Sequence, residues 1–253
     1  MKLIKKELKE YLDQKYLYYN RPEFILDDPI QIPHSFSTKE DIEISSFLMA
    51  TIAWGNRRSI LKNGEKLMQL MSYSPYEFVQ NYNGEKLPFV HRTFNAEDLQ
   101  FFLQALHNCY VKNGGLETLF ELNEGEFGVK QRIINFRTKF LATSHPSRSE
   151  KHVSNPEKGS AAKRLNMFLR WMVRNDGRGV DFGIWKNISP AQLYLPLDVH
   201  TGNIARQLGI LKRKQNDWTA LEEVQKILIE FDANDPVKYD FALFGIGANH
   251  ELD

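Results

Sequence analysis

The chain has 253 residues, of which 42% are hydrophobic and 26% charged, and its formal net charge is +1. This balance is typical of a globular protein with one large domain or two modest ones. No apolar run reaches the ~18 residues that a membrane-spanning helix needs, and the charged start, Met1-Lys-Leu-Ile-Lys-Lys, does not resemble a secretory leader. The single cysteine, Cys109, excludes an intramolecular disulfide framework, a four-cysteine zinc site and a cysteine-ligated iron–sulfur cluster. A reducing cytoplasm is therefore the expected compartment.

The basic residues are concentrated in the middle of the chain. Between positions 128 and 180, twelve Lys and Arg face three acidic residues, a net charge of +9, so that the rest of the chain carries −8. This asymmetry favours a surface that binds a polyanion. The alternative is a set of ordinary solvated helix faces, which charge clustering by itself does not exclude.

Hydrophobic periodicity predicts helices along almost the whole chain. In chain order they cover roughly residues 3–19, 38–54, 56–71, 95–112, 127–142, 160–174, 199–208, 219–230 and 236–245, with a short helix after residue 74 and a turn at residues 189–190. Capping boxes are expected at Ser74/Glu77 and at Thr219/Glu222. Residues 143–159 are polar and aperiodic, so they are predicted to form a mobile loop. No segment has the alternation of a strand, which predicts an all-α protein of about ten helices.

The segment with the clearest chemical signal is Leu195-Pro-Leu-Asp-Val-His-Thr-Gly-Asn-Ile-Ala-Arg-Gln-Leu-Gly-Ile210. Asp198 directly precedes a helix whose apolar face includes Ile204 and Leu208. An Asp in this place caps a helix by accepting hydrogen bonds from its free backbone N–H groups. The same place would hold a catalytic carboxylate in a fixed position, so on the residues alone both roles are open for Asp198.

This segment resembles the signature P-V-D-T-H-V-x-R-[IV]-A-x-R-L-G of the helix-hairpin-helix DNA glycosylases, in which the Asp is the catalytic carboxylate between two helical lobes. The matching residues are Pro196, Asp198, His200, Ile204, Ala205, Leu208 and Gly209. Asn203 stands where the family usually has arginine.

Three further segments resemble the same family in the same order. Residues 46–61 (SFLMATIAWGNRRSIL) are similar to its early helix–turn–helix, whose turn enters the space left by the extruded base. Residues 158–171 resemble the helix start that carries the nucleophilic lysine of strand-cleaving members, a place that Lys163 occupies, and are most similar to the archaeal 8-oxoguanine glycosylases. Residues 240–249 resemble the closing helix, without the iron–sulfur cysteines that many relatives add.

Two features qualify this resemblance. The hairpin pattern L-P-G-V-G-x-K-T-A is absent, so neither its phosphate grip nor a structural monovalent cation is expected. Residues 163–174 are also similar to an uncharacterised bacterial family grouped near these glycosylases.

The resemblance implies a monomeric, two-lobed base-excision-repair DNA N-glycosylase that acts on a damaged base, such as an oxidised purine, in double-stranded DNA. The helical lobe would cover about residues 38–185, and the second lobe residues 1–37 and 186–253. The implied catalytic residues are Asp198 and Lys163, with AP lyase activity through Lys163. The implied base-pocket or base-gap residues are Trp54, Asn56, Asn166, Trp171, Trp185 and His200. The implied contacts to the DNA backbone are Arg57, Arg58, Lys158, Arg164 and Arg170.

The chemistry explains why a lysine and an aspartate are needed. Breaking the C1′–N bond passes through an oxocarbenium-like state that a carboxylate stabilises, and a lysine can attack C1′ to form a Schiff base. The target base must also be extruded from the helix into a pocket. Lys163 could instead pair with Asp198 to hold the two lobes together, or contact a phosphate, and each tryptophan could belong to the core.

Other functions are carried as alternatives. The chain could be a non-catalytic helical protein that binds DNA or RNA, or a scaffold for an acidic protein. The seven histidines lack a zinc-binding spacing, so no metal or other cofactor is expected. Cys109 lies in an apolar segment and is predicted to be a buried residue rather than a nucleophile.

Overall fold

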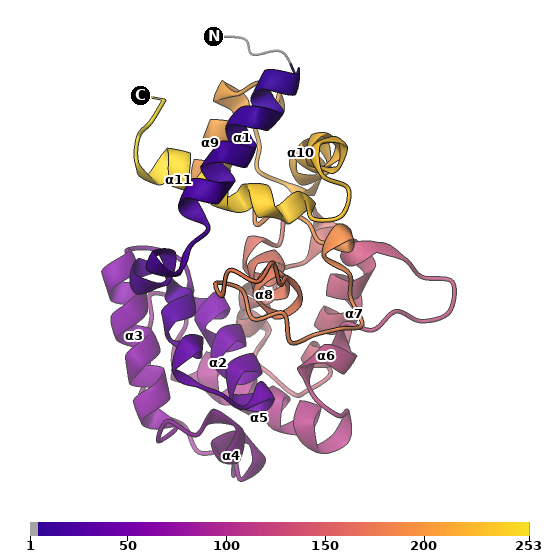
Figure 1. Cartoon of the computed structure of the whole chain (residues 1–253). Helices are drawn as coiled ribbons and strands as arrows, with labels where there is room; N and C mark the ends of the chain where they lie inside the picture. The colour runs from indigo at the N-terminus through magenta and orange to yellow at the C-terminus, as the bar shows by residue number, and fades with distance from the viewer. Residues whose placement is uncertain (1–4, 253) are drawn as a thin grey trace. The chain divides into compact units, whose positions relative to one another are not determined.

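The computed structural model describes residues 5–252, and all regular structure in that range is helical (Figure 1). The α-helices are α1 (Lys5–Tyr19), α2 (Lys39–Ile52), α3 (Arg57–Leu70), α4 (Pro75–Gln80), α5 (Ala96–Lys112), α6 (Leu116–Leu119), α7 (Gly128–Leu141), α8 (Lys163–Val173), α9 (Val199–Gln207), α10 (Trp218–Phe231) and α11 (Tyr239–Ala248). Short 3-10 helices cover Pro22–Asp27, Pro29–Gln31, Pro33–Ser35, Ser147–His152, Pro156–Lys158, Pro190–Gln192 and Pro236–Lys238. The all-α prediction is confirmed. None of the helices described is both long enough and apolar enough to cross a membrane.

The chain divides into two compact units. Unit 1 combines Met1–Ile25 with Pro156–Asp253, and unit 2 is the continuous segment Leu26–Asn155. The predicted lobes also joined the two ends of the chain, but with boundaries at residues 37/38 and 185/186. The second boundary differs because α8 belongs with the C-terminal segment, to which Arg170 and Arg174 are joined by ion pairs.

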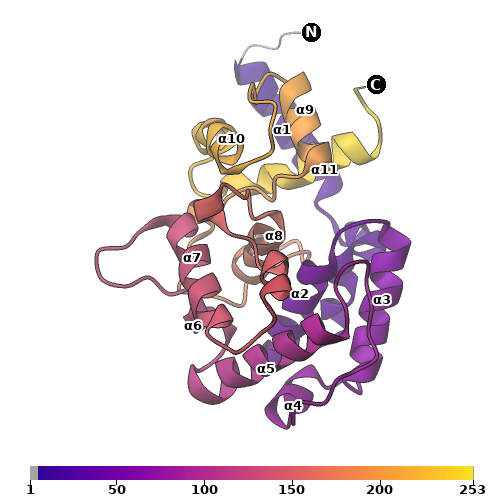
Figure 2. The same ribbon diagram turned by 180° about the vertical axis from the view of Figure 1, so that it is seen from behind.

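In unit 1, α11 lies between α1 and α9, and Figures 1 and 2 show α1 crossing α11 at close range. Helix α11 is apolar and buried along most of its length. Its Gly245 lies against the ring of Tyr19, where a Cβ atom would come within 2.2 Å of the ring carbons. The close packing of α1 on α11 therefore requires glycine at this position.

Helix α10 has a different cap from the one predicted. The predicted Thr219/Glu222 capping box is wrong, because the N-cap residue is Asp217, whose carboxylate accepts from the backbone N–H of Ala220 at 3.0 Å. Glu222 instead accepts a hydrogen bond from the indole of Trp218 at 2.9 Å.

In unit 2, α2 is buried over nearly its whole length, as its apolar sequence predicts. Phe47 of α2 is the centre of an aromatic cluster, with ring centroids 5.3–5.8 Å from those of Phe102, Phe136 and Phe140. Such edge-to-face and offset contacts add to the free energy of burial. Unit 2 therefore has an aromatic core to which α2, α5 and α7 contribute.

Two local predictions in unit 2 need correction. Ser74 precedes α4 but makes no side-chain hydrogen bond to it, so the predicted Ser74/Glu77 capping box is absent. Residues 147–152, predicted to lie in a mobile loop, form a 3-10 helix instead. This segment is held at the start of α5, because the buried carboxylate of Asp98 accepts from Ser149 Oγ at 2.6 Å and from Arg148 Nη1 at 2.8 Å.

Candidate functional site

Lys163 and Asp198 form an ion pair in unit 1. Lys163 is the first residue of α8 and Asp198 is the N-cap residue of α9. The Nζ atom of Lys163 lies 3.6 Å from Oδ2 of Asp198, and the two side chains are 31% and 23% exposed. The pair is therefore reachable from solvent. Since both residues belong to unit 1, the pair does not join the two compact units.

The carboxylate of Asp198 is held by the start of α9. Its Oδ1 atom accepts from the backbone N–H of Thr201 at 2.9 Å, which confirms the predicted cap and leaves Oδ2 facing Lys163. The carbonyl oxygen of Asp198 accepts from Nδ2 of Asn216 at 2.9 Å. Asn216 lies so close to Gly202 that a Cβ atom there would come within 2.6 Å of its amide oxygen. Glycine at position 202 therefore allows the contact that fixes the Asp198 backbone.

Helix α8 begins at Lys163, three residues later than predicted. The preceding residue, Ala162, has φ +48° and ψ +39° and offers no side-chain cap. Upstream, the carbonyl oxygen of Gly159 accepts from the backbone N–H of Trp218 at 2.9 Å. The segment before α8 is thus attached to α10 rather than continuing the helix, and this places Lys163 in the first turn.

Helix α8 presents three cations along one face. Lys163, Arg170 and Arg174 are seven and four residues apart, spacings that bring side chains to the same side of a helix. Each of the three pairs with carboxylates of unit 1. The pairs of Arg170 and Arg174 are buried, whereas that of Lys163 is partly exposed.

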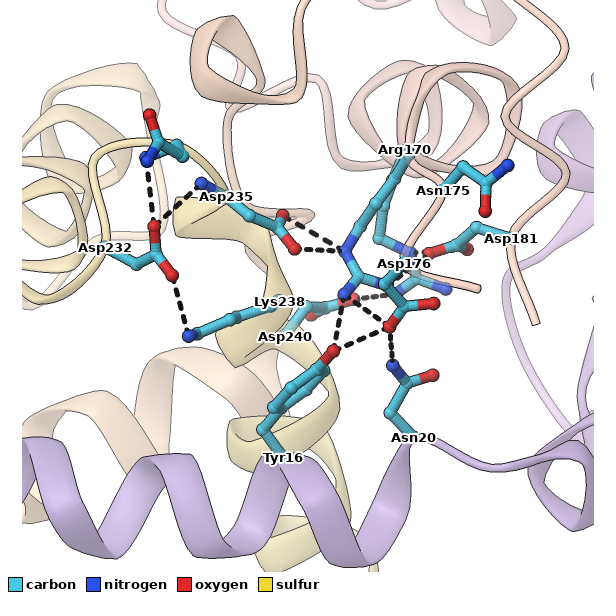
Figure 3. Close-up of polar contacts among 12 residues, drawn as sticks. Tyr16, Asn20, Arg170, Asn175, Asp176, Asp181, Asp232, Asp235, Lys238 and Asp240 are labelled. Carbon is cyan, nitrogen blue, oxygen red and sulfur yellow. Dashed lines mark hydrogen bonds and ion pairs between the residues drawn. The ribbon is translucent and has the colours of Figure 1, made fainter. Parts of the chain in front are cut away.

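Asp240, at the start of α11, connects this network to the Lys163–Asp198 pair. Its carboxylate accepts from Nη1 of Arg170, whose Nε atom lies 3.2 Å from Asp181 (Figure 3). Burial raises the pKa of Asp240 to about 6, an effect that Arg170 and Lys163 oppose and the negative charge of Asp198 increases. Sequence reasoning missed this residue, although an acidic side chain opening an otherwise apolar helix was a visible signal.

Arg174 lies at the centre of the same network. Its guanidinium donates to Asp235 at 2.9 Å, to Asp181 at 3.0 Å and to Asp176 at 2.9 Å, and it is almost completely buried. These carboxylates raise its pKa above the ordinary value, against the effect of burial. Tyr16 of α1 donates to Asp176 at 2.6 Å, so the network also fixes α1.

The predicted base-pocket residues of unit 1 are mostly structural. Trp171 and Trp185 are completely buried, and Trp185 packs edge-on against Phe168. Asn166 is also buried; its Nδ2 atom donates to the carbonyl oxygen of Ala161 at 3.0 Å, and its Oδ1 atom has no hydrogen-bond partner among the described residues. His200 is exposed on α9. The two tryptophans therefore belong to the core.

The predicted base-gap residues lie in unit 2. Asn56 caps α3 by accepting from the backbone N–H of Ser59 at 3.2 Å. Trp54 is half-buried, and the guanidinium carbon of Arg92 lies 4.8 Å from its ring centroid. Arg57 and Arg58 are exposed at the start of α3.

The predicted phosphate contacts of unit 1 differ in exposure. Lys158 is exposed. Arg164 is half-buried, and burial lowers the pKa of its guanidinium to about 10. Arg170 is not an exposed phosphate contact, because its guanidinium is buried between Asp181 and Asp240.

Part of the basic stretch at residues 128–180 is neutralised within the protein. Besides Arg170 and Arg174, Arg137 pairs with Glu150 at 2.8 Å and Arg148 with Asp98 at 2.8 Å. A polyanion-binding surface therefore cannot be inferred from the count of basic residues in this stretch.

In the part of the chain that the structure describes, neither the cysteine nor a cluster of metal-binding side chains gives a second site. Cys109 is buried in α5, and burial raises its thiol pKa to about 12, in agreement with the prediction of a core residue. Within residues 5–252, no group of three or more His, Cys, Asp and Glu side chains is placed to hold a metal ion. The expectation that the protein uses no cofactor stays a prediction.

A comparison with protein-family models gives one assignment. The model described as "Protein of unknown function (DUF2400)" matches residues 28–249. The chain belongs to this family. The DUF2400 match includes Lys163, Asp198 and Asp240, and therefore the whole candidate site. No curated protein and no solved structure matches the chain.

Proposed function

We propose that this protein is a DNA N-glycosylase with AP lyase activity, in which Lys163 is the nucleophile and Asp198 is the catalytic carboxylate. The observation that carries the proposal is the 3.6 Å distance between Lys163 Nζ and Asp198 Oδ2. The two residues are 35 positions apart in the sequence, yet they meet where the starts of α8 and α9 come together.

The pair has the parts that the reaction needs. The lysine amine, once it has lost a proton, attacks C1′ of the sugar while the C1′–N bond breaks and the departing base takes up a proton. The carboxylate of Asp198 stabilises the positive charge that develops on the sugar. The C1′–O4′ bond then breaks and O4′ takes up a proton, which gives a Schiff base between Lys163 and C1′. Loss of a proton from C2′ then drives β-elimination, in which the C3′–O3′ bond breaks and the 3′ phosphate leaves.

The Lys163–Asp198 pair is more exposed to solvent than the ion pairs of Arg170 and Arg174 on the same helix. The side chains of Arg170 and Arg174 are 4% and 1% exposed, as expected of structural ion pairs, whereas Lys163 is 31% exposed. A sugar could approach Lys163 and Asp198 but not the other two pairs. This difference supports a chemical role for the first pair and a structural role for the rest.

One observation favours the alternative of a non-catalytic nucleic-acid-binding protein. The hydrogen bond from the Thr201 backbone N–H to Asp198 is by itself a sufficient reason for an aspartate at that position. An experiment must therefore separate capping from catalysis.

Borohydride trapping tests the proposal, because borohydride reduces a Schiff base to a permanent crosslink. Duplexes that contain 8-oxoguanine, uracil, an alkylated base or an abasic site are incubated with the full-length protein and borohydride. We expect a crosslinked species that is lost in Lys163→Gln and retained in Lys226→Gln, an exposed lysine on α10.

The other outcomes discriminate between the candidates. Base release without crosslinking would leave a water-using glycosylase centred on Asp198. Neither release nor crosslinking on any of these duplexes would favour the non-catalytic binding protein.

A further inference from the structure

Helix α3, which lies outside the basic stretch at residues 128–180, has a row of exposed basic side chains. Its exposed side chains include Arg57, Arg58, Lys62 and Lys66. Residues 58, 62 and 66 follow one another at intervals of four, so they form a row along one side of the helix with steps of about 6 Å. The opposite side of α3 is buried through Ile60, Leu67 and Met68 and packs in unit 2.

Acidic residues do not neutralise this row. Among the described residues, no ion pair joins Arg58, Lys62 or Lys66 to a carboxylate. Glu65, the one acidic residue of α3, accepts a hydrogen bond from the hydroxyl of Tyr73. Like charges four residues apart on a helix repel one another and disfavour it. The row therefore does not stabilise α3. Arg170 and Arg174 of α8, by contrast, are paired with carboxylates.

A further arginine lies beside the start of α3. Arg92 is exposed at φ +56°, and its guanidinium carbon is 4.8 Å from the ring centroid of Trp54. A Cβ atom at Gly55 would come within 2.7 Å of Arg92 Nη1, so the absence of a side chain at residue 55 leaves room for the guanidinium. Arg92 is thus held next to the N-terminal end of α3, where the helix dipole attracts negative charge.

We propose that the α3 patch, defined as Arg57, Arg58, Lys62, Lys66 and Arg92, binds the phosphate backbone of double-stranded DNA. The choice of DNA as the partner rests on the proposed function. The choice of surface rests on the exposed charges of Arg58, Lys62 and Lys66, which no carboxylate of the described residues neutralises. A linear row of cations fits a linear polyanion, in which each strand carries one charge per about 3.4 Å of helix axis. Contacts of this kind fix the position of a protein on DNA and do not read its sequence.

The salt dependence of binding to an undamaged duplex tests the proposal. Fluorescence anisotropy gives the affinity of the full-length protein over a range of salt concentrations, and the slope of log K against log salt counts the phosphate contacts. The test variant combines Arg58→Gln, Lys62→Gln and Lys66→Gln. The control variant removes the same charge from exposed lysines elsewhere, with Lys112→Gln, Lys151→Gln and Lys226→Gln.

We expect the test variant to reduce the slope by about 3 and to weaken binding more than tenfold at about 0.1 M salt. The control variant should keep the wild-type slope. Thermal unfolding of both variants verifies that they are folded, and a Lys62→Gln, Lys66→Gln double variant, with a slope reduced by about 2, gives a second measurement.

Two results would overturn the inference. One is an unchanged slope in the test variant although the wild-type protein binds DNA. The other is binding of the wild-type protein to anionic lipid vesicles or to an acidic peptide, lost in the test variant, without binding to the duplex. An undamaged duplex contains no damaged base to excise, so this binding test does not depend on the proposed chemistry. Binding that depends on the α3 patch, without a borohydride crosslink on any duplex, would support this interface and contradict the proposed chemistry.

Discussion

Arg170 of α8 and Asp240 of α11 form a buried ion pair beside the partly exposed pair of Lys163 and Asp198. The guanidinium of Arg170 also binds Asp181, so that one cation serves two carboxylates. The burial of Asp240 and the charges of Lys163 and Asp198 all shift the pKa of the Asp240 carboxyl group. The candidate site is therefore electrically coupled to the core of unit 1.

Asp240 should make the stability of the protein depend on pH. Its pKa is raised to about 6 in the folded protein from the ordinary value of 3.8, so the folded state holds this proton more tightly than the unfolded chain does. The stabilising contribution is thus complete below about pH 4 and is lost as the pH rises through about 6. Relative to Asp240→Asn, the wild-type protein should lose on the order of 2–3 kcal/mol of unfolding free energy over this range.

Urea unfolding of both proteins from about pH 4 to about pH 7 measures this difference. The weakened contact with Arg170 in the variant adds an offset that does not vary with the protonation of residue 240. A difference that stays constant, or that grows in favour of the wild-type protein with rising pH, would contradict the expectation.

Substitutions of Asp198 should separate its structural role from its chemical one. Asparagine is as good an N-cap residue as aspartate, so Asp198→Asn should leave the free energy of unfolding almost unchanged. Asp198→Ala should lower it by about 1 kcal/mol, because the Thr201 N–H loses its acceptor. If Asp198 is catalytic, both variants should lose base release while they still bind DNA. Normal base release by Asp198→Asn would show that the residue is only a cap.

Arg174 should be essential for the stability of unit 1. Arg174→Met would leave Asp181, Asp235 and Asp176 close together without their shared cation, and loss of one partner of a buried pair typically costs about 3–5 kcal/mol. The midpoint of urea unfolding measures the loss. Arg21→Met is the matched control, since Arg21 pairs with Glu23 at the surface, where an ion pair contributes about 0–1 kcal/mol. Similar midpoints for the two variants would refute a structural role for the Arg174 network.

A tyrosine–glutamate pair should stabilise unit 2. Tyr110 donates to the buried carboxylate of Glu43 at 2.6 Å, and burial raises the pKa of this tyrosine. Tyr110→Phe leaves a buried carboxylate oxygen without this donor and should cost about 1–3 kcal/mol in unfolding free energy. Tyr73→Phe removes an exposed hydrogen bond to Glu65 and should have no measurable effect. Equal unfolding curves for the two variants would mean that burial does not strengthen the pair.

The features that could be predicted from the sequence are local. Thr38, Asn56, Asn95 and Asp198 each accept a hydrogen bond from a backbone N–H two or three residues further on, so neighbours in the sequence decide the cap. Helix periodicity is local in the same sense, and it predicted α2, α3, α5 and α9 to within a few residues. Two caps were assigned wrongly, because Ser74 and Thr219 had the right residue type without the right backbone geometry.

The partners of the charged residues were decided by the tertiary structure alone. Nothing near Arg170 in the sequence indicates that it binds Asp240, 70 positions away, and the charge count of residues 128–180 treated it as a free cation. The importance of Asp240 and the exposed row on α3 follow from the same fact. Burial and ion pairing depend on which helices pack together, and packing brings together residues that are far apart in the chain. The sequence by itself determined most of the α-helices to within a few residues, whereas only the fold determined where α8 begins and which charges remain available for chemistry and binding.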